Sequence, residues 1–168
     1  NSKELVLYEA EDLKTTIDTL FHEGTHLLAD LALKDKAQSL PIWFSEGLAE
    51  YFGASKFDVA TGTIEIGCVS KARLKNAVDL LKEGENISLP ELLSFSDYSA
   101  FDWPHYAFSW ALVHMLVERG SIEKKGKKKY TYRKSFIKLY EALARGSKAE
   151  AAFPALFGAA ADLEKELH

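Results

Sequence analysis

The amino-acid sequence predicts an α+β domain that is mostly helical and carries a small sheet. Apolar residues recur with the 3.6-residue period of a helix over residues 13–33, 42–52 and 103–119. Residues 3–8 instead alternate between apolar and polar side chains, as a strand does, and residues 57–69 have the composition of a hairpin. We therefore expect an edge strand near the amino terminus, one hairpin and a helical C-terminal part.

Length and composition indicate one domain, with no reason to expect a nucleic-acid partner and no membrane span within these residues. A chain of 168 residues buries roughly 70% of its unfolded surface, which is enough for one core. The net charge of −4 provides no attraction for nucleic acid or anionic lipid. No apolar run reaches the roughly 20 residues of a membrane span, and we identify no signal peptide. Cys68 stands alone, which excludes an internal disulfide and favours a small buried side chain in a strand.

The first predicted helix, residues 13–33, begins after Asp12, whose carboxylate suits an N-cap. Most of its apolar positions share one face, which we expect to be buried: Leu13, Ile17, Leu20, Gly24, Leu27 and Leu31. A glycine inside a helix costs about 1 kcal/mol relative to alanine. We therefore expect a neighbour to pack closely against Gly24. His22 and His26 lie on a different face.

Turn and capping residues divide the rest of the chain. Pro41 suits the start of the helix 42–52. The Thr-Gly pair at 61–62 suits a hairpin turn, and Ser88 suits the cap of a short helix. Further helices are expected over 71–82 and 103–119, with a loop over 94–102 between them, and two or three more follow over 130–145 and 148–167. The lysines within 124–129 lack interleaved aromatic residues, so we interpret them as a solvated loop.

Two histidines and a glutamate are the most informative pattern in the chain. His22 and His26 are four positions apart, so a helix stacks them on one face, and Glu23 lies at the edge of that face. Two imidazole nitrogens and one carboxylate are a typical ligand set for zinc that leaves a fourth position for water. Because Glu23 points too far round the helix to be a ligand as well, we predict that it is the general base. The pattern predicts one Zn²⁺ ion and a hydrolase.

The third zinc ligand must come from another helix, because three residues of one helix cannot close around a tetrahedral ion. Glu46 is the best candidate. Glu50 lies one turn further on the same face, where it could accept a proton from the free ring nitrogen of a ligating histidine. The competing interpretation, a pair of partly exposed surface histidines, does not account for companion glutamates on a second helix. Asp30 shares the helix that already supplies two ligands, so we interpret it as an exposed or supporting carboxylate.

Residues 22–26 together with 43–52 resemble the gluzincin metallopeptidases, a group that includes thermolysin and aminopeptidase N, and most closely the peptidase MA-like proteins. The tract 106–116 also resembles the helix that follows the site in peptidase MA-like proteins. The resemblance implies a zincin-like catalytic domain and a zinc-dependent peptidase acting on a peptide or protein substrate. It also implies for Glu50 the supporting role argued above. The glycine and third histidine of metzincins are absent after His26.

A catalytic tyrosine is a further implication of this resemblance. Relatives of aminopeptidase N carry a tyrosine about sixty residues after the glutamate ligand, where it stabilises the oxyanion of the tetrahedral intermediate. Tyr106 lies at a comparable distance from Glu46. The competing interpretation is an aromatic core residue with a satisfied hydroxyl. His105 is the alternative donor, and we interpret His114 as a core or supporting histidine.

Two functional alternatives to a peptidase stay open. One is a metal-binding but catalytically inactive zincin-like module that recognises a peptide or polysaccharide, and the other is a helical scaffold with no metal. In gluzincins the strand before the site helix pairs with the extended substrate, and residues before that strand help to grip it. Here those residues would precede Asn1, so we expect residues 1–168 to be a single catalytic domain from a longer protein. Endopeptidase and aminopeptidase action are equally compatible with the sequence.

Overall fold

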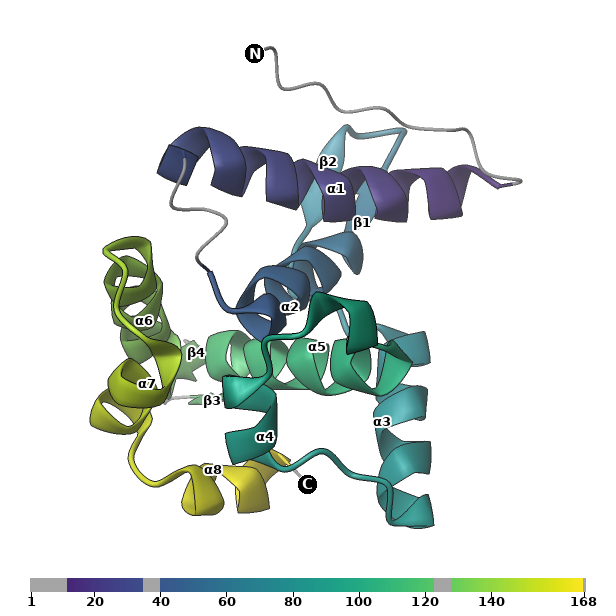
Figure 1. The fold of residues 1–168 in the computed structure, drawn as a ribbon. Helices are drawn as coiled ribbons and strands as arrows, with labels where there is room; N and C mark the ends of the chain where they lie inside the picture. The colour runs from purple at the N-terminus through teal and green to yellow at the C-terminus, as the bar shows by residue number, and fades with distance from the viewer. Residues whose placement is uncertain (1–11, 35–39, 123–127, 168) are drawn as a thin grey trace.

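The computed structural model describes residues 12–34, 40–122 and 128–167. Within them the chain is α+β and mostly helical, as predicted (Figure 1). The helices are α1 (Leu13–Leu33), α2 (Ile42–Gly53), α3 (Lys71–Glu83), α4 (Leu89–Ser94), the short 3-10 helix η2 (Tyr98–Ala100), α5 (Trp103–Glu118), α6 (Arg133–Ala144), α7 (Ala149–Phe157) and α8 (Ala160–Leu167). The strands are β1 (Lys56–Asp58), β2 (Thr63–Glu65), β3 (Gly120–Ile122) and β4 (Lys128–Tyr130).

The strands form two antiparallel hairpins, β1 with β2 and β3 with β4. The first is the hairpin predicted within 57–69, and it pairs Phe57 with Ile64. Cys68 lies beyond the end of β2 and is buried, so its expected burial is confirmed although its place in a strand is not. The second hairpin was not predicted. The edge strand expected at 3–8 and most of the lysine run lie outside the described residues.

Side-chain caps begin several of the helices at the predicted places. The carboxylate of Asp12 accepts a hydrogen bond from the Thr15 amide at 2.8 Å. This bond gives a partner to one of the amides at the start of α1 that have no acceptor within the helix. The hydroxyl of Ser88 accepts from the Glu91 amide in the same way at the start of α4. None of the helices described is both long and apolar enough to cross a bilayer.

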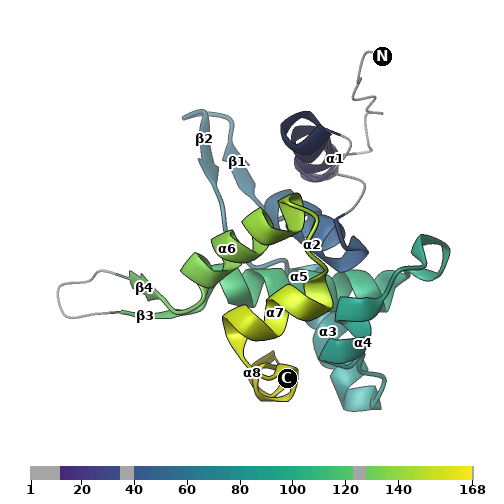
Figure 2. The same ribbon diagram turned by 60° about the vertical axis from the view of Figure 1, so that its left-hand side comes forward.

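Helix α2 occupies the centre of the molecule, between α1 on one side and α5 on the other (Figures 1 and 2). These two helices are its main packing neighbours. Helices α6 and α7 lie at one side of this stack and α3 at the other, while α4 and α8 contact each other below α5 (Figure 1). The central position explains why α2 is the most buried helix in the first half of the described chain.

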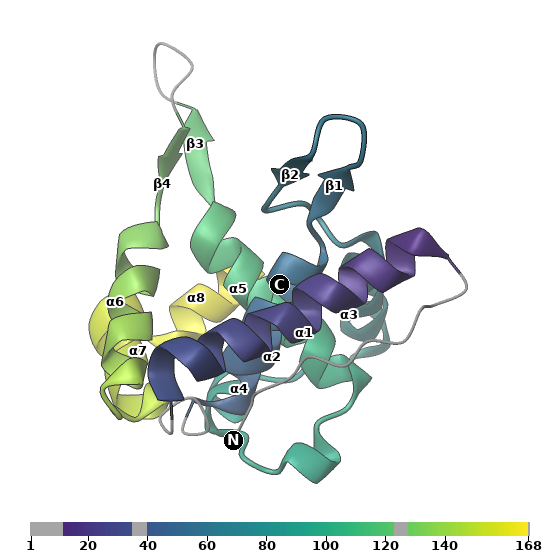
Figure 3. The same cartoon turned by 90° about the horizontal axis from the view of Figure 1, so that it is seen from above.

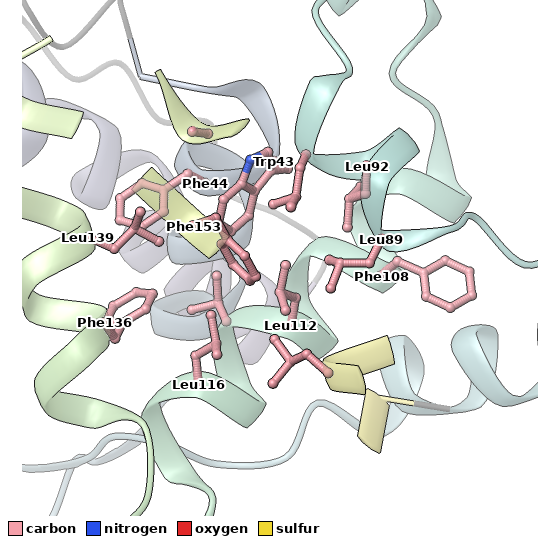
Figure 4. Close-up of a cluster of buried hydrophobic side chains, with 14 of the residues drawn as sticks. Trp43, Phe44, Leu89, Leu92, Phe108, Leu112, Leu116, Phe136, Leu139 and Phe153 are labelled. Atoms are coloured by element: carbon pink, nitrogen blue, oxygen red, sulfur yellow. The ribbon is translucent and has the colours of Figure 1, made fainter. Parts of the chain in front are cut away.

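Aromatic side chains at the start of α2 anchor it in the core. Trp43 and Phe44 are fully buried, and their rings meet edge to face with centroids 5.3 Å apart. The Trp43 ring packs against Phe153 of α7, and the Phe44 ring stacks on Phe136 of α6 at 5.5 Å. Leu112 of α5 is among the aliphatic side chains that surround them (Figure 4). Burying two such rings stabilises the fold by several kcal/mol, roughly 1.5–3 kcal/mol for each large apolar side chain.

Two glycines of α2 allow its neighbours to approach closely. A Cβ atom added at Gly47 would lie 2.7 Å from both the Ser109 carbonyl oxygen and the Val113 Cγ2 atom of α5. A Cβ atom added at Gly53 would lie 3.3 Å from the Asp18 carbonyl oxygen and 3.5 Å from the His22 Cβ atom of α1. The spacing of all three central helices therefore depends on the absence of these side chains.

The predicted buried face of α1 is wrong. None of the residues of α1 is buried, and on the predicted face the side chains of Leu13, Leu20 and Leu31 are 66%, 39% and 58% exposed. Helix α2 packs against the histidine face of α1 instead, and Figure 3 shows α1 lying over α2 from above. Among the described residues, nothing lies within 4 Å of a Cβ atom added at Gly24, so the expected close packing there is also wrong.

The glycine contacts predict opposite effects of one added methyl group. Gly47→Ala drives a Cβ atom into α5 and should lower the free energy of unfolding by about 1–3 kcal/mol. Gly24→Ala meets open space among the described residues and should raise this free energy by up to about 1 kcal/mol, through helix propensity. Urea unfolding of the two variants beside the parent measures both. A Gly47→Ala protein as stable as the parent would contradict the packing described.

Candidate metal centre

Helix α1 presents His22 and His26 to α2 on one face. Their ring centroids are 5.0 Å apart and the ring planes are nearly perpendicular, at 76°. Both side chains are partly buried, with 21% and 29% of their surface exposed. The four-residue spacing places the two rings one helical turn apart, so both can reach a common point above α2.

Glu46 of α2 meets both rings. Its side chain is only 3% exposed. Oε2 lies 3.5 Å from Nε2 of His22, and Oε1 lies 3.6 Å from Nε2 of His26. One potential ligand atom from each of these three residues lies within 4.8 Å of the other two. The structure therefore brings the three predicted zinc ligands together, as the "metal cluster" His22, His26 and Glu46.

The other nitrogen of each ring also has a neighbour on α2. Nδ1 of His22 lies 3.5 Å from Oε1 of Glu50, and Nδ1 of His26 lies 3.3 Å from the Ser45 hydroxyl. Both rings thus turn Nε2 toward Glu46 and Nδ1 toward a polar group that holds the ring. Metal-binding histidines in proteins commonly have this arrangement, with the second nitrogen hydrogen-bonded to an acceptor that orients the ring.

One atom of Glu46 is left without a hydrogen bond. Among the described residues Oε2 is buried and has no hydrogen-bond partner, although Oε1 accepts one from the Tyr98 hydroxyl at 3.0 Å. A buried carboxylate oxygen without a partner costs about 1–3 kcal/mol or more. A divalent cation would satisfy it. Two imidazole nitrogens and one carboxylate are ligands of the type and number that zinc binds in proteins, so the residues present fit a zinc ion.

The cluster is polarised even without a cation. Burial acts to raise the pKa of Glu46, but the neighbouring His22 and His26 rings and the Tyr98 hydroxyl outweigh it and lower this pKa from 4.5 to about 2. The Glu46 carboxylate in turn raises the pKa of His26 above 6.5, against the effect of burial. Glu46 is therefore ionised at neutral pH, as a metal ligand must be.

Glu50 is held from its far side by Arg73, near the start of α3. The guanidinium donates from Nε to Oε2 at 2.7 Å and from Nη2 to Oε1 at 2.6 Å. Two parallel bonds of this kind fix a carboxylate in both position and plane. Glu50 is 14% exposed and Arg73 is 26% exposed, so solvent screens the pair only weakly.

Two tyrosines border the metal cluster. Tyr98, on η2, donates to Glu46, and Tyr106, on α5, lies beside the Tyr98 phenol. Burial and the Glu46 charge raise the pKa of both phenols, so each keeps its proton at neutral pH. Arg73 lies over the Tyr106 ring, 5.3 Å from its centroid. The structure thus places Tyr106 near the cluster, and Tyr98 in direct contact with a predicted ligand.

Glu23 lies on the open side of α1. Its side chain is exposed, and it lines a groove of about 900 Å³ together with His22, Glu50 and Arg73. The walls of the groove come from the amino-terminal half of α1, the end of α2 and the start of α3. Glu23 therefore borders the space through which water or a substrate would reach His22.

The remaining histidines of the described chain have other roles. Nδ1 of His105 lies 2.6 Å from the Asp102 carboxylate, where the pair caps the start of α5. Nε2 of His114 lies 3.3 Å from the Gly67 carbonyl oxygen. Neither ring contributes to the metal cluster. His105 is thus engaged in a helix cap, and His114 is partly buried, with its ring beside those of Tyr51 and Trp110.

Tyr98 and Arg73 are the site residues that sequence reasoning missed. Tyr98 lies in the predicted loop 94–102. No sequence pattern in this loop predicts that Tyr98 contacts Glu46. Arg73 is one of several charged residues on α3, and no spacing relates it to Glu50. A requirement that the Glu50 carboxylate have a basic partner would have suggested a search for an arginine, but not which one.

Comparison with known proteins identifies a family but no characterised relative. Residues 16–129, more than half of the chain, match the family model described as "Protein of unknown function (DUF1570)". The matched segment contains the metal cluster, Glu23, Glu50, both tyrosines and Arg73. No curated protein matches the chain, and no solved structure matches it.

The shifted pKa values predict how pH affects the zinc-free protein. The lowered pKa of Glu46 contributes stability that is present above the ordinary value of 4.5 and is lost as pH falls through about 2. The raised pKa of His26 contributes stability that is present below 6.5 and is lost as pH rises through the higher folded value. The contribution of the pair should therefore be largest between about pH 4.5 and 6.5.

Urea unfolding in the presence of a chelator, at a series of pH values, measures this contribution. It is the difference in the free energy of unfolding between the parent and Glu46→Gln. The difference should pass through a maximum within that window. Glu141→Gln, an exposed change on α6, is the matched control and should leave the pH profile unchanged. A difference that does not vary with pH would contradict the coupling of Glu46 to the histidines.

Proposed function

This chain belongs to the family described as a protein of unknown function, DUF1570, and we propose that it is a zinc-dependent peptidase. One observation carries the proposal. Two helices converge so that His22, His26 and Glu46 offer ligand atoms within 4.8 Å of one another, and the buried Oε2 atom of Glu46 has no hydrogen-bond partner in the described chain. The gluzincin resemblance of the same residues supports the reaction class.

We also propose that the helical body is zincin-like. In support, the helix that carries the histidine pair packs directly on the helix that carries the glutamate, and α5 supports that second helix from behind. The C-terminal helices α6 and α7 contribute the core contacts of Trp43 and Phe44. This arrangement gives the glutamate ligand a rigid base, which a metal site of defined geometry requires.

We assign the roles of metal ligand and general base to the two glutamates from the burial of each carboxylate. Glu46 is almost fully buried and ionised, which suits a ligand, whereas Glu23 is exposed to the groove, which suits a base that must exchange protons with water and substrate. When bound, zinc would supply Lewis acidity to the substrate carbonyl and lower the pKa of a water molecule. Glu23 would take the proton of the attacking water and pass it to the leaving amine.

The two tyrosines are proposed to act differently. Tyr98 donates to Oε1 of Glu46, so it would hold the carboxylate in its ligand orientation. Tyr106 is proposed to stabilise the oxyanion, because its phenol stays protonated and borders the same cluster. Removing one such donor typically costs about 2.7–4 kcal/mol of transition-state stabilisation.

Substitution of the cluster separates metal binding from turnover. The purified parent should contain one zinc ion per chain, and His22→Ala or Glu46→Ala should lose it. Glu23→Gln should keep the zinc and lose about 100- to 10,000-fold in turnover, because only the proton acceptor is removed. Metal analysis and hydrolysis of unfolded proteins and blocked peptides, with and without chelator, measure both properties.

The outcomes distinguish the alternatives. A parent protein that binds zinc but hydrolyses no member of the panel would favour the inactive binding module. A parent protein without bound zinc, even after zinc is added, would favour the metal-free scaffold. A Glu23→Gln protein with the turnover of the parent would remove the proposed mechanism.

Substitution of the two tyrosines should have different effects in the same assays. Tyr106→Phe should lower turnover about 100- to 1,000-fold, the effect of losing one oxyanion donor, and leave zinc affinity unchanged. Tyr98→Phe should instead weaken zinc binding, because Glu46 loses the donor that orients it. Zinc affinity is measured by competition with a chelator of known strength. Full activity of Tyr106→Phe would contradict its proposed role.

A further inference from the structure

We infer that Arg73 is a positioning residue for the metal centre, which acts on the zinc ligand His22 through Glu50. This inference rests on the proposed function, because it concerns how a proposed zinc ligand is oriented. Arg73 comes from α3, a helix that contributes neither a predicted ligand nor the predicted base. Its effect on the metal would therefore be indirect.

The chain of contacts runs from α3 to the histidine. Both oxygens of Glu50 accept hydrogen bonds from the Arg73 guanidinium, at 2.6 and 2.7 Å. The same Oε1 atom that accepts from Arg73 lies 3.5 Å from Nδ1 of His22. Because a bidentate pair fixes the plane of the carboxylate, Arg73 decides where Glu50 presents that oxygen to the ring. Nε2 of the same ring faces Glu46.

Arg73 is itself held on two sides. The hydroxyl of Ser70, the N-cap of α3, accepts a hydrogen bond from the Arg73 amide at 3.3 Å. The guanidinium also lies over the Tyr106 ring, 5.3 Å from its centroid. Tyr106 adjoins Tyr98, which donates to Glu46. Arg73 thus contacts Glu50, which faces His22, and Tyr106, which adjoins the tyrosine that donates to Glu46.

Arginine has properties here that lysine lacks. Its planar fork matches the two oxygens of a carboxylate, whereas a lysine ammonium is a point charge that cannot fix the carboxylate plane. Loss of the guanidinium would leave Glu50, which is 14% exposed, as a largely buried charge with one partner fewer. Such a group rotates toward water, and this would withdraw it from His22.

Zinc affinity tests the inference without an activity assay. Arg73→Ala should weaken zinc binding about 10- to 100-fold, the usual effect of losing a group that orients a metal ligand. Arg73→Lys keeps the charge and should restore part of this affinity. Lys75→Ala removes an exposed cation from the same helix and should bind zinc like the parent. Thermal unfolding of the zinc-free proteins reports any general loss of stability.

A double-mutant cycle identifies the path. If Arg73 acts through Glu50, Arg73→Ala should have little further effect on zinc affinity in a Glu50→Ala protein. Parent-like affinity of Arg73→Ala, or an equal loss in both backgrounds, overturns the inference while the proposed function stands. Should Arg73→Ala not fold, the same comparison with Arg73→Lys decides. A parent protein that binds no zinc overturns the proposed function and this inference together.

Discussion

The buried carboxylate of Glu46 is the interaction on which the rest of the structure depends. Transfer of a carboxylate out of water costs several kcal/mol unless charged or hydrogen-bonding neighbours compensate. Here the compensation comes from both sides, as α1 supplies two imidazole rings and η2 supplies the Tyr98 hydroxyl. The groups that surround this carboxylate come from α1 and from the segment before α5, which therefore meet at the same point of α2.

The packing around α2 makes that arrangement rigid. Trp43 and Phe44 hold the start of the helix in the aromatic core, while Gly47 and Gly53 allow α5 and α1 to approach its opposite sides. A side chain on α2 therefore has little freedom to move relative to α1. Rigid placement of a ligand set lowers the cost of ordering it when a cation binds, which is the physical basis of a preorganised site.

Solvent exposure decreases from the groove to the core. The exposed Glu23 borders the groove, the partly buried histidines come next, and Glu46 lies beneath them. Glu50 and Arg73, which also line the groove, form an ion pair that is mostly shielded from water. Such a network stabilises one geometry only if each member is satisfied. Oε2 of Glu46 is therefore informative, since it lies 3.5 Å from Nε2 of His22 without a hydrogen bond, whereas Oε1 accepts one from Tyr98.

The sequence by itself determined the local features. Helical periodicity predicted α1, α2 and α5 closely, and helix geometry alone placed His22 beside His26 and Glu46 beside Glu50. Only the tertiary structure decided which face of α1 is covered, and it selected the histidine face over the leucine face. It also decided that Tyr98 and Arg73 join the site. Spacings within a helix follow from the backbone, whereas contacts between helices depend on the volumes and charges of many side chains packed at once.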